Sequence, residues 1–255
     1  MIRKGGRATK EAVILMAKAP FPGRVKTRLC PHLTHAEAAR LYACMLGDTA
    51  EEISSVARIG RYLFLDPPGS ADSPPGAPFS AFDRFPQRGK DLGEKMWDAA
   101  ATAFRSGARR VVIVGADCPS LSAGTVRQAF RELSTGASVV FGPSADGGYY
   151  LVGLSSPDER LFRGFRWSTA EVLRNAAARC RILSAPFSFL PPGRDVDTVE
   201  DLLALRKWAR AHARPACPRT REWLTGFFGP GAGGFPGPPE RKSGPPRGTR
   251  SRRGG

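Results

Sequence analysis

Short apolar runs of strand length alternate along this chain with longer stretches of helical periodicity. The first run, Ala12–Lys18, is too short for a helix and apolar enough for a buried strand. Similar runs recur at Arg110–Gly115 and Tyr149–Leu154, with helical sequence between them. Strands that alternate with helices predict an α/β fold whose open, mostly parallel central sheet is covered on both faces.

Weaker signals complete this pattern. Two of the expected helices begin at a capping-box spacing, Thr34 to Glu37 and Ser168 to Glu171. The further expected strands are 59–65 and 137–141. The expected helices are, in chain order, 34–56, 91–104, 121–133, 168–179 and 198–213, the last of which is the last clear helix.

The middle of the chain is expected to form one domain between two basic ends. Residues 229–255 contain 15 Gly or Pro among 27 residues, and such a stretch buries too little apolar area to offset its ordering entropy. We therefore expect a single folded domain over 11–228, a disordered N-terminus over 1–10 and a disordered tail over 229–255. The Pro-rich stretch 67–81 is expected to be a surface loop inside the domain.

The net charge of +16 invites a nucleic-acid-binding interpretation, but its distribution weakens it. The first ten residues hold four basic and no acidic side chains, and 229–255 hold six basic and one acidic, so more than half of the surplus lies on the ends. Nucleic acid is thus an expected partner only weakly, through the tail. The surplus left on the domain suits phosphorylated substrates.

The composition also restricts the compartment. No apolar run approaches the roughly 20 residues that cross a bilayer. The five cysteines are scattered, without a C-x-x-C pair, which argues against a disulfide framework or a zinc site and for reduced thiols. We therefore expect a cytoplasmic protein with no membrane span. Its oligomeric state stays open.

A cationic loop follows the first strand, and ligands bind open α/β sheets at the carboxyl ends of the strands. Guanidinium groups suit phosphate oxygens, and glycine lets the backbone approach a ligand. The spacing of a Walker loop is absent, and a basic surface loop is the alternative. The candidate phosphate-binding residues are Lys18, Gly23, Arg24, Lys26, Thr27 and Arg28.

Three aspartates are candidate ligands of a divalent cation. Asp117 follows the strand Arg110–Gly115, and Mg²⁺ prefers one or two carboxylates together with water and substrate phosphates. Asp195 and Asp197 are two residues apart in a segment expected to be extended, and alternate residues of an extended segment face the same way. The alternatives are a turn residue at Asp117 and acids that stabilise a helix start at the other two positions.

Two further loops carry candidate binding residues. Asp146-Gly147-Gly148-Tyr149 joins two strands; a hairpin turn is favoured, and a site for a sugar or ribose is the alternative. Gln87, Gly89 and Asp91 precede a helix and form either a loop that reads a base or ribose, or a turn and a helix cap.

Several blocks together resemble a bacterial family of GT-A-fold transferases, which includes arsenosugar-biosynthesis-type glycosyltransferases. The fold is shared with phospholactate guanylyltransferase and with molybdenum-cofactor nucleotidyltransferases. The blocks lie in order over roughly 11–210. They are K-A-P-x-P-G-R-V-K-T-R-L at 18–29, the stretch 87–96, G-x-D-x-P at 115–119, D-G-G-Y-Y-L at 146–151, W-S-T at 167–169 and R-D-V-D-T at 194–198.

The resemblance implies a three-layer GT-A fold, like that of nucleotide-diphosphosugar transferases, with the nucleotide at the first loop. It implies catalytic roles for Asp117, Lys26 and Asp146, and an Mg²⁺ or Mn²⁺ ion on Asp117 with Asp195 or Asp197. Phosphate contacts are implied for four cations of the first loop, Lys18, Arg24, Lys26 and Arg28. The substrate loop is implied to comprise Asp146, Gly147, Gly148, Tyr149, Trp167, Ser168 and Thr169.

The expected function is therefore transfer of a glycosyl group from a nucleotide sugar to a small-molecule acceptor. The alternative is nucleotidyl transfer from a nucleoside triphosphate to a phosphorylated acceptor, with release of pyrophosphate. A glycosyltransferase D-x-D motif would need an acid at position 115, where this chain has Gly115, and this departure favours the alternative. A second departure is Cys118, in place of a hydroxyl residue.

Overall fold

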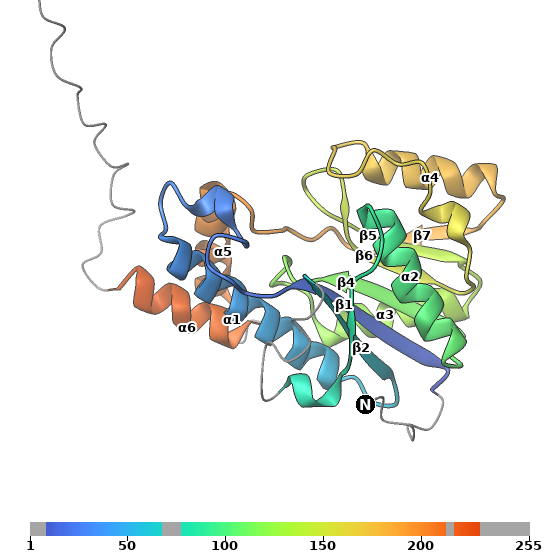
Figure 1. Ribbon diagram of the computed structural model, residues 1–255, viewed down its shortest axis with the longest axis horizontal. Coiled ribbons are helices and arrows are strands. Elements are labelled where there is room, and N and C mark those ends of the chain that lie inside the picture. The colour runs from blue at the N-terminus through green and yellow to red at the C-terminus, as the bar shows by residue number, and fades with distance from the viewer. Residues whose placement is uncertain (1–8, 68–77, 213–216, 230–255) are drawn as a thin grey trace, which may run out of the picture.

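The computed structural model describes residues 9–67, 78–212 and 217–229, and a seven-stranded sheet forms its centre (Figure 1). The strands are β1 (Glu11–Lys18), β2 (Gly60–Asp66), β3 (Asp83–Pro86), β4 (Arg110–Gly115), β5 (Val139–Pro143), β6 (Tyr149–Leu154) and β7 (Phe187–Phe189). Their order across the sheet is β3-β2-β1-β4-β6-β5-β7. Only β6 is antiparallel to its neighbours, so the predicted α/β fold with a mostly parallel sheet is confirmed.

The central strands form because their side chains are apolar on both faces. In β1, Val13 and Leu15 point to one face and Ala12 and Ile14 to the other, and all four are fully buried. The parallel pairing of β1 with β4 brings the carboxyl ends of both strands to one edge of the sheet. Candidate side chains that follow these two strands therefore emerge close together.

Six helices in the described residues surround the sheet. They are α1 (His35–Ser54), α2 (Leu92–Arg105), α3 (Ala123–Ser134), α4 (Val172–Ile182), α5 (Val199–Ala211) and α6 (Pro218–Phe227). Helices α1 and α3 cover one face, and α2 and α4 cover the other (Figure 1). Helices α5 and α6 pack on the far side of α1, which gives that side of the molecule an extra helical layer.

The helix starts follow local capping in two clear cases. Thr34 accepts a hydrogen bond from the Glu37 amide while the Glu37 side chain accepts one from the Thr34 amide, and α1 begins there as predicted. Thr198 and Asp201 form the same reciprocal cap at α5. Both caps satisfy amides that the first helical turn leaves without partners.

Two sequence predictions about helices are wrong. Helix α4 does not begin at Ser168: that residue has a left-handed backbone, φ 61°, whereas an N-cap needs an extended one, and α4 starts at Val172 without a side-chain cap. The helix expected over 198–213 is not the last one, since α6 follows it.

Helix α6 is capped by a residue from α1. Asp48 is only 1% exposed, and its carboxylate accepts hydrogen bonds from the amides of Arg219 and Thr220, at 3.0 and 2.8 Å. The Thr220 hydroxyl donates to the same carboxylate at 2.7 Å. The start of α6 is thus fixed by a residue 171 positions earlier in the chain.

The ends of the chain and one loop bear on the expected domain limits. Residues 1–8 and 230–255, which hold most of the two expected disordered ends, lie outside the described residues, as does the stretch 68–77 of the expected surface loop. Among the described helices, none combines the length and the apolar character needed to cross a membrane.

Candidate active site

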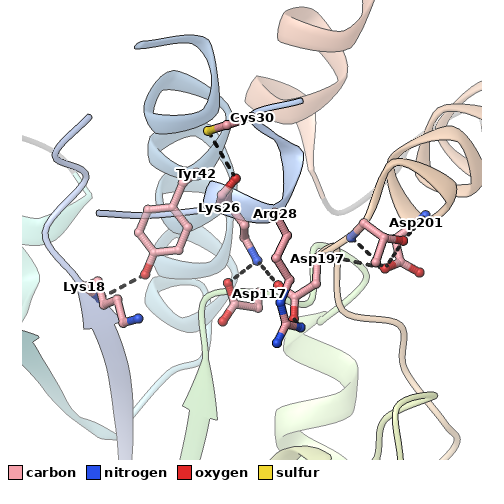
Figure 2. A network of polar contacts seen from close by, with 9 residues as sticks. Lys18, Lys26, Arg28, Cys30, Tyr42, Asp117, Asp197 and Asp201 are labelled. Atoms are coloured by element: carbon pink, nitrogen blue, oxygen red, sulfur yellow. Dashed lines mark hydrogen bonds and ion pairs between the residues drawn. The ribbon is translucent and has the colours of Figure 1, made fainter. Parts of the chain in front are cut away.

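The side chain of Lys26 joins two carboxylates that come from distant parts of the chain (Figure 2). Its Nζ atom lies 2.5 Å from Oδ1 of Asp117 and 2.9 Å from Oδ1 of Asp197. The Lys26 side chain is only 4% exposed, whereas those of Asp117 and Asp197 are 48% and 43% exposed. The ammonium group is therefore enclosed, while both carboxylates keep one side open to solvent.

Two features of the fold bring these groups together. Lys26 lies in the loop after β1, and Asp117 lies just after β4, at the same edge of the sheet. Asp197 lies on the segment between β7 and α5, and the neighbouring Val196 amide donates a hydrogen bond to the Asp117 carbonyl at 3.0 Å. The same segment is anchored further back, because the Tyr150 hydroxyl donates to the Pro191 carbonyl at 3.0 Å.

The site holds more negative than positive charge. Burial by itself would lower the pKa of Lys26, but the charges of Asp117 and Asp197 outweigh it and the pKa is raised, so the ammonium stays protonated. Burial, followed by the charges of Asp117 and Asp146, raises the pKa of Asp195 to about 7. Three other carboxylates thus act on Asp195 around a single enclosed cation.

A cleft of about 360 Å³ opens at this edge of the sheet. Its polar end is formed by Lys26 and the aspartates just described. Its other end reaches between α2 and α4 onto the sheet, where Met16, Met96 and Trp167 line it. A ligand in this cleft would have charged groups at one end and an apolar surface at the other.

The turn after β5 contributes to the cleft and is also a tight hairpin. The Asp146 carboxylate accepts hydrogen bonds from the Ser144 hydroxyl and, at 3.0 Å, from the Gly148 amide. Gly147 has φ +86°, and a Cβ atom there would lie 2.2 Å from the Ala170 carbonyl oxygen. The interpretation of this loop as a turn is therefore confirmed, and Asp146 and Gly148 also line the cleft. A contact with a sugar or ribose stays a prediction.

The residues predicted to bind ligands divide into two groups. The cleft is lined by Lys18, Lys26, Gln87, Asp117, Asp146, Gly148, Tyr149, Trp167, Ser168, Thr169, Asp195 and Asp197. The residues that do not line it are Gly23, Arg24, Thr27, Arg28, Gly89, Asp91 and Gly147. Gly23, Arg24, Thr27 and Arg28 are exposed on the loop after β1, and Arg28 lies 3.9 Å from Asp197.

The stretch before α2 has mainly structural contacts. Gln87 is buried, and its amide donates to the carbonyls of Ala17 and Phe64, at 2.8 and 3.0 Å, which ties the ends of β1 and β2 together. Asp91 caps α2 by accepting from the Glu94 amide at 2.9 Å. Asp91 lines a separate hollow of about 550 Å³ on the outer side of α2.

Tyr42 of α1 is a site residue that no sequence motif predicted. Its hydroxyl accepts a hydrogen bond from the Lys18 amide at 2.9 Å, and its ring lies 6.0 Å from the Lys26 ammonium (Figure 2). Burial raises the pKa of Tyr42, so the hydroxyl stays neutral. Its position on the buried face of an amphipathic helix carries no local signal of this role.

Carboxylates such as Asp117 and Asp197 are ligands of the type that a divalent cation prefers. Within the described ranges, no three His, Cys, Asp or Glu side chains are grouped as a complete metal site. Mg²⁺, however, commonly binds one or two carboxylates and takes water and substrate phosphates for its other positions. Asp117 and Asp197, each open to the cleft on one side, match that requirement, with the Lys26 ammonium now between them.

Comparisons with known proteins agree with this architecture. The model of a family described as "uncharacterized protein conserved in bacteria (DUF2064)" matches residues 49–169. The chain is 31% identical to a candidate nucleotide-diphospho-sugar transferase from Desulfovibrio desulfuricans G20, with a TM-score of 0.76 over 86% of this chain and 95% of that one. None of the curated proteins matches the chain.

Two more distant structures share the fold. A cytidylyltransferase from Leptospira borgpetersenii is 14% identical, with a TM-score of 0.55 over 86% of this chain and 94% of that one. Rv0371c from Mycobacterium tuberculosis H37Rv, in complex with manganese, is 16% identical, with a TM-score of 0.50 over 77% of this chain and 98% of that one. At these identities the likeness concerns the fold.

Proposed function

The chain belongs to the DUF2064 family of bacterial proteins, and from that premise we propose that it transfers a glycosyl group from a nucleotide sugar to a small-molecule acceptor. The observation that carries the proposal is the meeting of Lys26, Asp117 and Asp197 in one cleft. The extensive likeness to the Desulfovibrio desulfuricans protein supports the nucleotide-sugar donor.

The cationic side chains would act on the diphosphate of the donor. Lys26, enclosed at the polar end of the cleft, and Arg28, exposed at its edge, place positive charge where the leaving nucleotide diphosphate gains negative charge. Electrostatic stabilisation of developing charge is commonly the largest contribution to catalysis. Lys18 ends β1 on the same side and lines the cleft, so it is the third cation assigned to phosphate.

Asp117, with Asp197 and Asp195, would hold Mg²⁺ or Mn²⁺, which when bound stabilises the leaving group as a Lewis acid. Asp146 borders the cleft on the side of Trp167 and α4, and we assign it to the acceptor. The turn that carries Asp146 is held against the first turn of α4, since the Leu173 amide donates to the Gly147 carbonyl at 3.0 Å. This contact keeps the Asp146 carboxylate in place before the acceptor molecule binds.

The second candidate reaction is nucleotidyl transfer, and Gly115 favours it. This residue lines the cleft at the position where a D-x-D motif would carry an acid. A Cβ atom at Gly115 would meet only the Asp117 amide nitrogen, at 4.0 Å, so crowding does not explain the glycine. In this reaction a phosphorylated acceptor attacks the α-phosphorus of a nucleoside triphosphate, and positioning and charge matter more than proton transfer.

Identification of the small product separates the two reactions. The protein is supplied with Mg²⁺ or Mn²⁺, with panels of nucleotide sugars and nucleoside triphosphates, and with a panel of small-molecule and phosphorylated acceptors. Nucleoside diphosphate with a glycosylated acceptor supports the first reaction, and pyrophosphate supports the second. The absence of both products across the panels would contradict the proposal.

Asp117→Ala tests the site itself. We expect loss of metal-dependent turnover when equal amounts of folded protein are compared, since Asp117 also pairs with the enclosed Lys26 and its removal lowers stability. Asp83→Ala is the matched control, since Asp83 is an exposed aspartate at the amino end of β3 and does not line the cleft. Wild-type turnover in the Asp117 variant would overturn the assignment.

The compartment that we propose for the protein is the cytoplasm, because all five cysteines are unpaired thiols.

A further inference from the structure

We propose that Lys26 is the built-in counter-ion of Asp117 and Asp197, which a divalent cation must displace, so that the cation binds well only together with phosphates that draw Lys26 away. The inference rests on the proposed function for the identity of the phosphate ligand. It concerns the order of binding, which the proposed reaction leaves open.

The positions of the two cations exclude one another. The Lys26 ammonium lies 2.5 Å from Oδ1 of Asp117 and 2.9 Å from Oδ1 of Asp197. A magnesium ion on the same oxygens needs distances of about 2.1 Å and near-octahedral geometry. It would therefore occupy nearly the same volume as the ammonium, and the two positive charges would repel.

The charge around Lys26 explains why it occupies this position. Besides Asp117 and Asp197, the carboxylates of Asp195 and Asp146 interact with the cluster electrostatically. Arg28 is the next cation, but it lies 3.9 Å from Asp197 and its side chain is 75% exposed. Water screens an exposed charge more than an enclosed one. Lys26 therefore neutralises more of the negative charge of the aspartates than Arg28 does.

The Lys26 ammonium can also move away from the two carboxylates. The four-carbon stem of the lysine allows the ammonium to move without the backbone. Arg24, Thr27 and Arg28, which lie near Lys26 in the chain, are exposed, whereas its neighbour Val25 is buried. The ammonium can therefore move only toward the exposed side of this loop.

Binding of the two ligands should then be coupled. Phosphates that attract the ammonium release the carboxylates for the cation, and the cation in turn releases the ammonium for phosphate. Coupling of this kind is reciprocal: each ligand raises the affinity for the other by the same factor. Without the Lys26 ammonium, a divalent cation would bind the carboxylates in the empty cleft with no need to displace another positive charge.

The test measures Mn²⁺ binding to metal-stripped protein without any nucleotide, by titration calorimetry and by the loss of the free Mn²⁺ resonance signal. For Lys26→Met we expect Mn²⁺ affinity at least tenfold above wild type. Arg28→Met is the matched control, because it removes a cation of the same loop that does not bridge the carboxylates; we expect a change below threefold. Mn²⁺ should also raise the unfolding temperature of Lys26→Met more than that of the wild type.

Equal or weaker Mn²⁺ affinity in Lys26→Met would overturn the inference, as would an equal gain in Arg28→Met. Lys26→Gln, which keeps polarity without charge, serves where the methionine variant does not fold without metal, and the same tenfold gain is expected. Nucleotide binding is measured separately on the wild type. Tight Mn²⁺ binding by the variant without nucleotide binding by the wild type would refute the proposed function alone.

Discussion

Replacement of Asp195 by asparagine should make the protein more stable at high pH and leave the low-pH stability nearly unchanged. Burial and the charges of Asp117 and Asp146 raise the pKa of Asp195 from its ordinary 3.8 to about 7. In the unfolded chain the carboxyl group ionises near its ordinary pKa. Asparagine has nearly the same shape and does not ionise, so Asp195→Asn removes the titration and little else.

The sign follows from proton counting. Between about pH 4 and pH 7 the folded state holds a proton on Asp195 that the unfolded state has lost, so the free energy of unfolding falls as pH rises. Each unit of pKa difference corresponds to 1.36 kcal/mol, which places the full loss near 4 kcal/mol above pH 7. The variant should avoid this loss, and its advantage over the wild type should grow by about 3 kcal/mol from pH 4.5 to pH 8.

Urea unfolding of both proteins, metal-stripped and followed by tryptophan fluorescence, measures the difference at each pH. Part of the shift comes from like charges, so 0.5 M salt should shrink the variant's advantage. A difference between variant and wild type that stays constant within about 0.5 kcal/mol across the range, or that narrows with rising pH, would refute the reasoning.

Two more predictions concern helix caps, one supplied by a distant residue and one by the adjoining residue. Asp48→Ala should cost roughly 3 kcal/mol of stability in urea unfolding, because it leaves the amides at the start of α6 without an acceptor and removes a buried charge from beside Arg219. Thr34→Ala should cost about 1 kcal/mol in the same assay, because it removes the cap of α1.

Each of these has a matched control. Glu51→Ala removes the exposed partner of Arg219 and should cost under about 1 kcal/mol; an equal cost at Glu51 and Asp48 would contradict the capping role of Asp48. Ser168→Ala should change stability by less than about 0.5 kcal/mol, since Ser168 caps no helix. A loss at Ser168 as large as that at Thr34 would contradict the corrected start of α4.

The central strands and most helices were predictable because their signals are local. The strand Arg110–Gly115 is apolar on both faces and bounded by polar residues, and its predicted limits coincide with those of β4. The edge strands β3 and β7 were missed, since they have four and three residues and no apolar run. Helix α6 was missed because its cap, Asp48, is supplied by another helix, which no local pattern reveals.

The candidate site was predictable as far as topology determines it. Lys26 and Asp117 follow neighbouring parallel strands, so their proximity follows from the order of the sheet. The arrival of Asp197 depends on contacts between loops, such as that of Val196 with the Asp117 carbonyl, and was only a hypothesis from the sequence. Tyr42 could not be identified, because a buried aromatic residue on an amphipathic helix is ordinary core.

The segment that carries Asp197 comes late in the chain, after all seven strands. A chain emerging from the ribosome therefore exposes the β1 loop and Asp117 long before the carboxylate that completes the cluster is synthesised. During that interval Lys26 has one anionic partner in place of two. Strands β1 to β6 can therefore pair while the pocket is still unfinished, since β7 and Asp197 follow them in the chain.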